Sequence, residues 1–143
     1  MLPRPLARFV FVALLLAAAS SSALAAEVTV NIDVPGNRWK TVRLRNLPQG
    51  TSVSLQILAS GGIRVIVVDS TELKRFPKTR ALFEASVDQR LGFSVVIPRT
   101  GDYYVVFDNR KSTEPRQVTL RVKAESPANR RPTPRSEANP DQT

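Results

Sequence analysis

The sequence contains no cysteine and no histidine among its 143 residues. Without these side chains there is no thiol nucleophile, no disulfide, no Cys/His zinc site and no Ser-His-Asp triad. Packing alone must therefore stabilise the fold, even in an oxidising compartment. Carboxylates, hydroxyls and lysines are the groups that remain for catalysis.

Long apolar runs are also scarce, and the longest lies near the N-terminus. Two arginines precede Phe9–Ala19, and serines and the small-x-small sequence Ala23-Leu24-Ala25 follow it. This order is typical of a secretory signal peptide, whereas a membrane-spanning helix needs about 20 apolar residues. We predict a signal peptide over residues 1–25, a periplasmic or secreted destination, and no transmembrane segment in the mature chain.

After residue 25, apolar and polar residues alternate in short segments separated by Pro, Gly and Asn. Such alternation between frequent turns is typical of an antiparallel β-sandwich. We predict an all-β domain over residues 26–124, with seven to eight strands in a jelly-roll or immunoglobulin-like arrangement; a small closed β-barrel is the alternative. The predicted strands cover residues 27–34, 38–47, 52–59, 63–69, 93–97, 103–107 and 116–124. The fourth, 63–69, is apolar on both faces apart from Arg64, which predicts a central strand.

The most apolar and aromatic stretch of the mature chain is residues 91–109. It has two alternating segments joined by a Gly-containing turn at residues 98–102. This pattern predicts a β-hairpin at the centre of the core. Tyr103 is expected to face the core, and Tyr104, on the opposite face, to be exposed or covered by a neighbouring segment.

Two stretches lack the alternation. In residues 70–90, Ser70 or Thr71 is a suitable N-cap for a short helical turn, and Leu82 and Phe83 are expected to enter the core from a loop or a short strand. A stretch of this length either connects two sheets or acts as a functional loop. Residues 125–143 have four prolines and no large apolar side chain, which predicts a disordered tail.

Positive charge is in excess, with 21 Lys and Arg against 12 Asp and Glu. Arg43, Arg45, Arg121 and Lys123 alternate with apolar residues, so they project from the outer faces of strands. If the second and last strands share a sheet, these side chains form a basic face for an anionic glycan, lipid headgroups or envelope phosphates. The alternative is a solvated face that prevents aggregation. Nucleic acid is not an expected partner, because aromatic residues for stacking are few.

Other candidate site residues are one tryptophan and several carboxylates. Trp39, between two cations, either stacks on a sugar ring or closes the edge of the sandwich, and Tyr104 is a second candidate for stacking. Asp102 and Asp108 are candidates for a carboxylate pair or for Ca²⁺ ligands. Both also lie where Asp commonly serves turn geometry, so we predict no catalytic residues, no metal and no cofactor.

The segment 93–109, FSVVIPRTGDYYVVFDN, resembles the closing hairpin of bacterial pre-peptidase C-terminal domains and is similar to GOLD-type β-sandwiches. The run Trp39–Leu47, followed by Gly50 and an alternating strand, is similar to the early part of the former family. The resemblance covers residues 38–122 and implies a β-sandwich. It also implies a non-catalytic accessory that assists secretion, substrate attachment or protein interaction.

Together these features predict an exported, non-catalytic binding module of the cell envelope, with a protein or an anionic polymer as its partner. A small carboxylate-dependent hydrolase is one alternative, and it would need a cleft with converging Asp or Glu. A structural envelope protein is another, and it would show a uniform surface without a patch.

Overall fold

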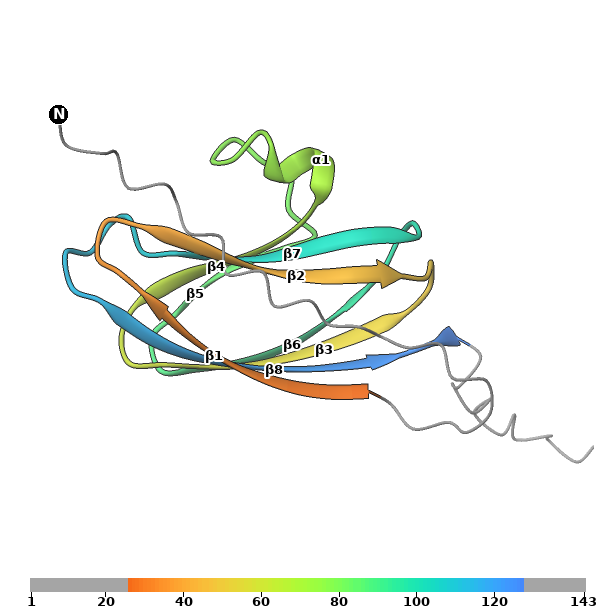
Figure 1. Cartoon of the computed structure of the whole chain (residues 1–143), viewed down its shortest axis with the longest axis horizontal. Coiled ribbons are helices and arrows are strands. Elements are labelled where there is room, and N and C mark those ends of the chain that lie inside the picture. The colour runs from red at the N-terminus through yellow and green to blue at the C-terminus, as the bar shows by residue number, and fades with distance from the viewer. Residues whose placement is uncertain (1–25, 128–143) are drawn as a thin grey trace, which may run out of the picture.

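The computed structural model describes residues 26–127, which form eight strands and one short helix (Figure 1). The predicted signal peptide, and residues 128–143 of the predicted tail, lie outside the described residues. The last strand includes Glu125, the first residue of that tail. The elements are β1 (Ala26–Val34), β2 (Trp39–Leu47), β3 (Ser52–Ala59), β4 (Ile63–Asp69), α1 (Ser70–Leu73), β5 (Phe83–Val87), β6 (Arg90–Val96), β7 (Gly101–Asp108) and β8 (Arg116–Glu125).

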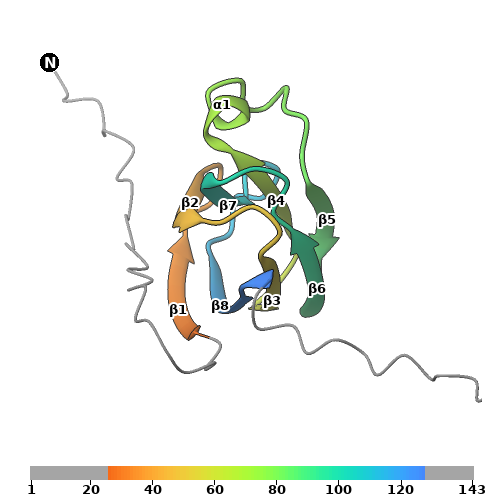
Figure 2. The same cartoon turned by 90° about the vertical axis from the view of Figure 1, so that its right-hand side faces the viewer.

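The strands form two four-stranded antiparallel sheets that pack face to face (Figure 2). Sheet A has the order β1-β8-β3-β6, and sheet B has the order β2-β7-β4-β5. Except for β4 and β5, consecutive strands lie in opposite sheets, which is the connectivity of a jelly roll. The predicted β-sandwich is confirmed, because the strands form two separate sheets instead of a closed barrel.

The main core fills the space between the sheets and consists of the inward-facing apolar residues of the strands. Phe107, Leu55 and Leu120 are fully buried there, and Tyr103 is buried as predicted. The hydroxyl of Tyr103 donates a hydrogen bond of 2.6 Å to the carbonyl of Arg99, so this buried polar group has a partner. The alternation of the sequence therefore predicts correctly which side chains enter the core.

Residues 91–109 do not form the predicted hairpin. β6 pairs with β3 in sheet A, whereas β7 lies between β2 and β4 in sheet B. The turn at residues 98–102 therefore carries the chain from one sheet to the other. Both segments place alternate residues in the same core. The alternating pattern is therefore the same for a hairpin and for this crossover, and it cannot distinguish them.

The short helical turn predicted in residues 70–90 is confirmed as α1, but the predicted N-cap, Ser70 or Thr71, is wrong. The N-cap of α1 is Asp69, whose carboxylate accepts a 2.7 Å hydrogen bond from the amide of Glu72. β5 pairs with β4 and places Phe83 against Phe93, with ring centroids 3.6 Å apart. Phe83 thus packs against the core as predicted, whereas Leu82 is 41% exposed and does not.

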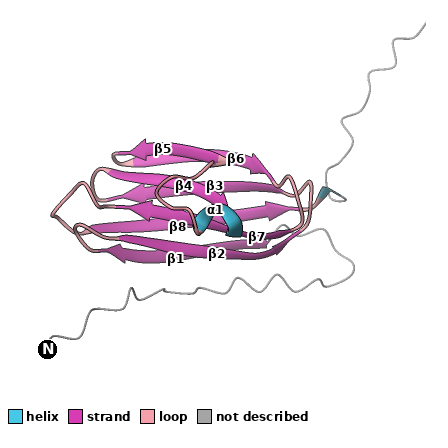
Figure 3. Ribbon diagram, turned by 90° about the horizontal axis from the view of Figure 1, so that it is seen from above, coloured by secondary structure: helices cyan, strands magenta, loops and turns pink. Residues whose placement is uncertain are grey.

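A second, smaller apolar cluster lies on the outer face of sheet B. Residues of the 70–82 segment, including Leu73 and Phe76, pack over Ile66, Val68 and Val106. α1 lies over this face of sheet B when the sandwich is seen from above (Figure 3). This cover explains why β4 is buried on both faces, which confirms the prediction of a central strand. Within residues 26–127, sheet A carries no comparable cover on its outer face.

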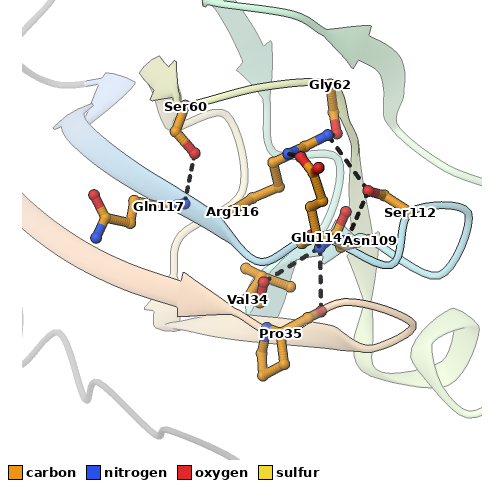
Figure 4. A network of polar contacts seen from close by, with 9 residues as sticks. All are labelled: Val34, Pro35, Ser60, Gly62, Asn109, Ser112, Glu114, Arg116 and Gln117. Atoms are coloured by element: carbon orange, nitrogen blue, oxygen red, sulfur yellow. Dashed lines mark hydrogen bonds and ion pairs between the residues drawn. The ribbon is translucent and has the colours of Figure 1, made fainter.

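Asn109 joins the turns at one end of the sandwich (Figure 4). Its side-chain amide donates to the carbonyls of Val34, Pro35 and Glu114 at 3.3, 3.1 and 2.8 Å. The backbone N–H of Asn109 donates to the carbonyl of Arg38 at 2.9 Å. Asn109 is buried, and it connects the β1–β2 turn to the β7–β8 turn.

Candidate functional site

The four residues predicted to form one basic face lie on two faces. Arg43 and Arg45 are on β2 in sheet B, and Arg121 and Lys123 are on β8 in sheet A. The outer faces of the two sheets point in opposite directions (Figure 2). The prediction of a single basic face is therefore wrong, because alternation assigns a side chain to a face but not to a sheet.

Arg43 is engaged within its own sheet. Its Nε donates to the carboxylate of Asp102 at 3.2 Å, its Nη2 binds the same carboxylate, and its guanidinium lies 5.9 Å from the ring centroid of Tyr104. Asp102 also accepts a 2.8 Å hydrogen bond from the amide of Asn46. The hydrogen bonds from Arg43 and from Asn46 hold the pKa of Asp102 below its usual value. Arg43 is thus largely neutralised by its partner.

Asp108 forms a second, separate carboxylate–arginine pair. Its oxygens accept hydrogen bonds from Nε and Nη2 of Arg110 at 2.8 and 2.9 Å. Burial acts to raise the pKa of Asp108, but the hydrogen bonds from Arg110 outweigh it and leave that pKa below its usual value. The Arg110 guanidinium also lies 4.7 Å from the ring centroid of Phe76, which anchors the segment that covers sheet B.

The two carboxylates do not converge. Asp102 and Asp108 lie near opposite ends of β7, about 20 Å apart along an extended strand. Each is bound by its own arginine, so neither has a second carboxylate with which to share a substrate. Among residues 26–127, no group of three or more Asp and Glu side chains could hold a metal ion.

Trp39 and Tyr104 are both associated with the second apolar cluster. Each packs, partly buried, against the cluster on the outer face of sheet B, and the Trp39 ring lies 4.8 Å from that of Phe76. The covering segment therefore packs on Tyr104, one of the two arrangements that the sequence predicts. A stacking role for either ring toward a ligand stays a prediction.

The outer face of sheet A contains a hollow of about 280 Å³. Its lining residues come from the adjacent strands β3, β6 and β8 of sheet A. Sheet A lies on the side of the sandwich away from α1 (Figure 2). Its lining combines two arginines, two uncharged polar side chains, aliphatic side chains and one glycine: Gln56, Ile57, Leu58, Arg90, Leu91, Gly92, Thr119 and Arg121.

The hollow follows from the register of the three strands. Gly92, Gln56 and Arg121 lie side by side in one row across the sheet. Because Gly92 has no side chain, it leaves a gap beside Gln56 on the outer face of sheet A. A Cβ at this position would meet only the carbonyl oxygen of Leu55, at 4.0 Å. The next row contains Arg90, Leu58 and Thr119, of which Leu58 is 46% exposed.

The two arginines of the hollow are available to a ligand. The side chain of Arg90 has no hydrogen bond or ion pair within residues 26–127. Nε of Arg121 lies 3.3 Å from the carboxylate of Glu27, but both side chains are about half exposed. Such surface pairs contribute little stability, so an anion can displace Glu27 at small cost. Arginine suits this role because its planar fork binds carboxylate, sulfate or phosphate through two hydrogen bonds.

Sequence reasoning identifies Arg121 and Lys123 on this face but misses Arg90, Gly92, Gln56 and Leu58. Arg90 opens β6, but the alternating pattern begins only at Phe93, so the sequence places Arg90 in the irregular stretch. The one available signal is Gly92 beside an alternating strand, which often indicates close approach of a ligand or another backbone.

No helix within residues 26–127 is both long and apolar enough to cross a membrane. No protein-family model and no curated protein sequence matches the chain.

Solved structures with a similar fold include PliG from Aeromonas hydrophila, a periplasmic inhibitor of g-type lysozyme. It is 17% identical, with a TM-score of 0.50 over 72% of this chain and 88% of that one. The Yersinia pseudotuberculosis-derived mitogen is 10% identical, with a TM-score of 0.52 over 70% and 86%. The pre-peptidase C-terminal domain of the Bacillus anthracis collagenase is 11% identical, with a TM-score of 0.46 over 70% and 90%. At these identities the likeness to PliG and to the mitogen shows the fold alone, which is a β-sandwich as the sequence predicts.

Proposed function

We propose that the protein is an exported, non-catalytic binding module that binds an anionic polysaccharide on the outer face of sheet A. The observation that carries this proposal is the hollow between Arg90 and Arg121, on the sheet face that the 70–82 segment leaves uncovered. Export to the periplasm or beyond is supported by the N-terminal sequence pattern.

The shape of the hollow favours a polymer over a small molecule. Pockets that enclose small ligands usually have volumes of about 300–1,000 Å³, and this hollow, of about 280 Å³, lies below that range and opens onto the face of a sheet. An extended chain can lie across such a face and place one acidic residue in the depression. Ser54 and Ser94, whose hydroxyls lie 3.0 Å apart on the same face, continue the polar surface beyond the hollow.

The side chains of the face favour an anionic glycan over a neutral one. None of the aromatic residues within 26–127 lines the hollow, whereas neutral sugar rings are commonly bound by stacking on such side chains. Arg90 and Arg121 instead supply hydrogen bonds that favour a negatively charged group. Lys123 lies beside Arg121 on β8, and within residues 26–127 its one ion-pair partner is Glu125, at 3.6 Å with both side chains about half exposed. It adds positive charge to the outer face of sheet A.

A polymer-binding experiment tests the proposal. Dextran sulfate is the probe, neutral dextran is its control, and binding is followed by isothermal titration at two salt concentrations. We expect the protein to bind dextran sulfate and not dextran, and the Arg90→Gln/Arg121→Gln variant to bind at least about tenfold more weakly, because oxyanion hydrogen bonds are lost as well as charge.

The matched control is Arg38→Gln/Arg80→Gln, which removes the same charge from exposed sites outside sheet A. We expect this variant to lose less than about threefold in affinity, through long-range charge alone. An equal loss in both double variants, or no binding of dextran sulfate by the native protein, would contradict the proposed site. If the protein instead captured a protein from an envelope extract, and both double variants captured it equally well, the partner would be a protein.

A further inference from the structure

β6 is the edge strand of sheet A beside the hollow. It pairs with β3 along seven consecutive residue pairs without a bulge, and its other side has no neighbouring strand within residues 26–127. β5, the edge strand of sheet B, lies on the same side of the sandwich but does not pair with β6 (Figure 2). A row of backbone donors and acceptors therefore runs along the free side of β6.

The hydrogen bonds at both ends of β6 identify these free groups. The amide of Ile97 donates to the carbonyl of Thr51, and the amide of Ala59 donates to the carbonyl of Gln89, both at 2.9 Å. Both bonds follow the register of the β3–β6 pairing. In an antiparallel ladder the residues that bond to the neighbouring strand alternate, so the odd-numbered residues of β6 bond to β3. The free N–H and C=O groups belong to Arg90, Gly92, Ser94 and Val96.

Apart from the exposed cation Arg90 at its start, β6 lacks the features by which edge strands avoid pairing. Charged residues, proline, bulges and short length are the usual protections, and β6 has no charge or proline between Leu91 and Val96. β2 carries three cations and a break in register between Leu44 and Leu47, and β5 has only five residues. Val96, at the end of β6, is 57% exposed, the highest value among the exposed large apolar side chains within residues 26–127.

We propose that β6 pairs antiparallel with β6 of a second copy, so that two A sheets become one continuous eight-stranded sheet. One register, centred on Phe93, pairs all four free-edge residues. It places Gly92 opposite Ser94 and Arg90 opposite Val96 of the other copy, in two-fold symmetry. The aliphatic stem of each Arg90 then covers the exposed Val96 of its neighbour.

The same antiparallel, two-fold self-pairing is unfavourable for β1, the other edge strand of sheet A. Self-pairing of β1 about its centre places Glu27 opposite Asp33 of the second copy, and like charges directly opposite each other are destabilising. In the β6 pairing the two Arg90 side chains lie at opposite ends of the paired strands. Charge therefore selects β6 over β1 for self-association.

The dimer would place both hollows on the same side of one sheet, because residues paired across an antiparallel ladder point to the same face. This arrangement gives a polymer two sites at once. The self-association itself does not depend on the proposed function, since it rests on the backbone edge and on the aliphatic stem of Arg90, and it needs no bound anion.

Sedimentation equilibrium of the purified full-length exported protein, without ligand, tests the pairing. Ser94→Pro removes one outward N–H while the amides that bond to β3 remain, and proline is tolerated at such edge positions. Ser94→Ala is the matched control, because it keeps the N–H and loses only the hydroxyl contact with Ser54. We expect the native protein and Ser94→Ala to form dimers in a series up to about 100 µM, and Ser94→Pro to stay monomeric.

Val96→Lys is a second variant that leaves the backbone unchanged. It places a cation opposite Arg90 of the other copy at an exposed position, so we expect a monomer with the native circular dichroism spectrum. A native protein that stays monomeric throughout the series, or dimers that both Ser94→Pro and Val96→Lys leave intact, would overturn the proposal. Loss of dextran sulfate binding with intact dimers would refute only the proposed function.

Discussion

Replacing Asn109 by Asp is expected to lower the free energy of unfolding by at least about 3 kcal/mol. The two side chains have nearly the same shape, so packing is preserved. What changes is the charge and the loss of two N–H donors. In the native protein the amide group donates to three carbonyls, those of Val34, Pro35 and Glu114. A carboxylate has no hydrogen to donate, and it would place negative charge against those three oxygens in a buried site.

Urea denaturation followed by circular dichroism measures this loss. The matched control is Asn31→Asp, the same chemical change at an exposed site on β1 where the side chain accepts from Thr119 at 3.0 Å. We expect the control to change stability by less than about 0.5 kcal/mol. Similar stabilities for the two variants would show that Asn109 does not hold the turns together.

Gly36→Ala is expected to destabilise the protein by about 3 kcal/mol, because the close approach of two turns leaves no room for a side chain. A Cβ at Gly36 would lie 2.0 Å from the carbonyl oxygen of Thr113 and 2.3 Å from its carbonyl carbon. These atoms belong to the backbone of the β7–β8 turn, which Asn109 also holds. The clash can be relieved only if one of the two turns moves and the Asn109 hydrogen bonds lengthen.

Gly62→Ala is the control for the general effect of replacing a glycine. No atom lies within 4 Å of a Cβ at Gly62, which is in the turn between β3 and β4 at the same end of the sandwich. Urea midpoints of the two variants should differ clearly, with Gly62→Ala within about 0.5 kcal/mol of the native protein. If Gly36→Ala were equally stable, the two turns would not be in contact in solution.

The alternation of the sequence predicts the strands and the core of this fold well, but not the partners of each strand. Phe93 and Phe107 both face the core, which the alternation shows, yet β6 and β7 belong to different sheets. A jelly roll differs from a series of hairpins in its long-range pairing, and side-chain periodicity contains no information on that pairing. The sequence of residues 91–109 therefore predicts correctly that this stretch enters the core, and predicts wrongly that it forms a hairpin.

The candidate site was only partly predictable for the same reason. Arg121 projects outward as expected, but the residues beside it come from β3 and β6, which are distant in the sequence. The predicted partner Arg43 lies on the other sheet and is bound by Asp102. The five residues of β5 pair with β4, but they show no clear period, so the sequence alone leaves a loop and a short strand as alternatives there.

The central claim is that the outer face of sheet A is the ligand-binding surface. Titration of dextran sulfate into the ¹⁵N-labelled protein, followed by NMR, tests this claim most directly. We predict that the largest amide shift changes cluster at Gln56, Gly92 and Arg121, with little change at Arg43 and Trp39 on the other sheet. Shift changes centred on β2, or spread evenly over all exposed cations, would contradict the assignment of the site to sheet A.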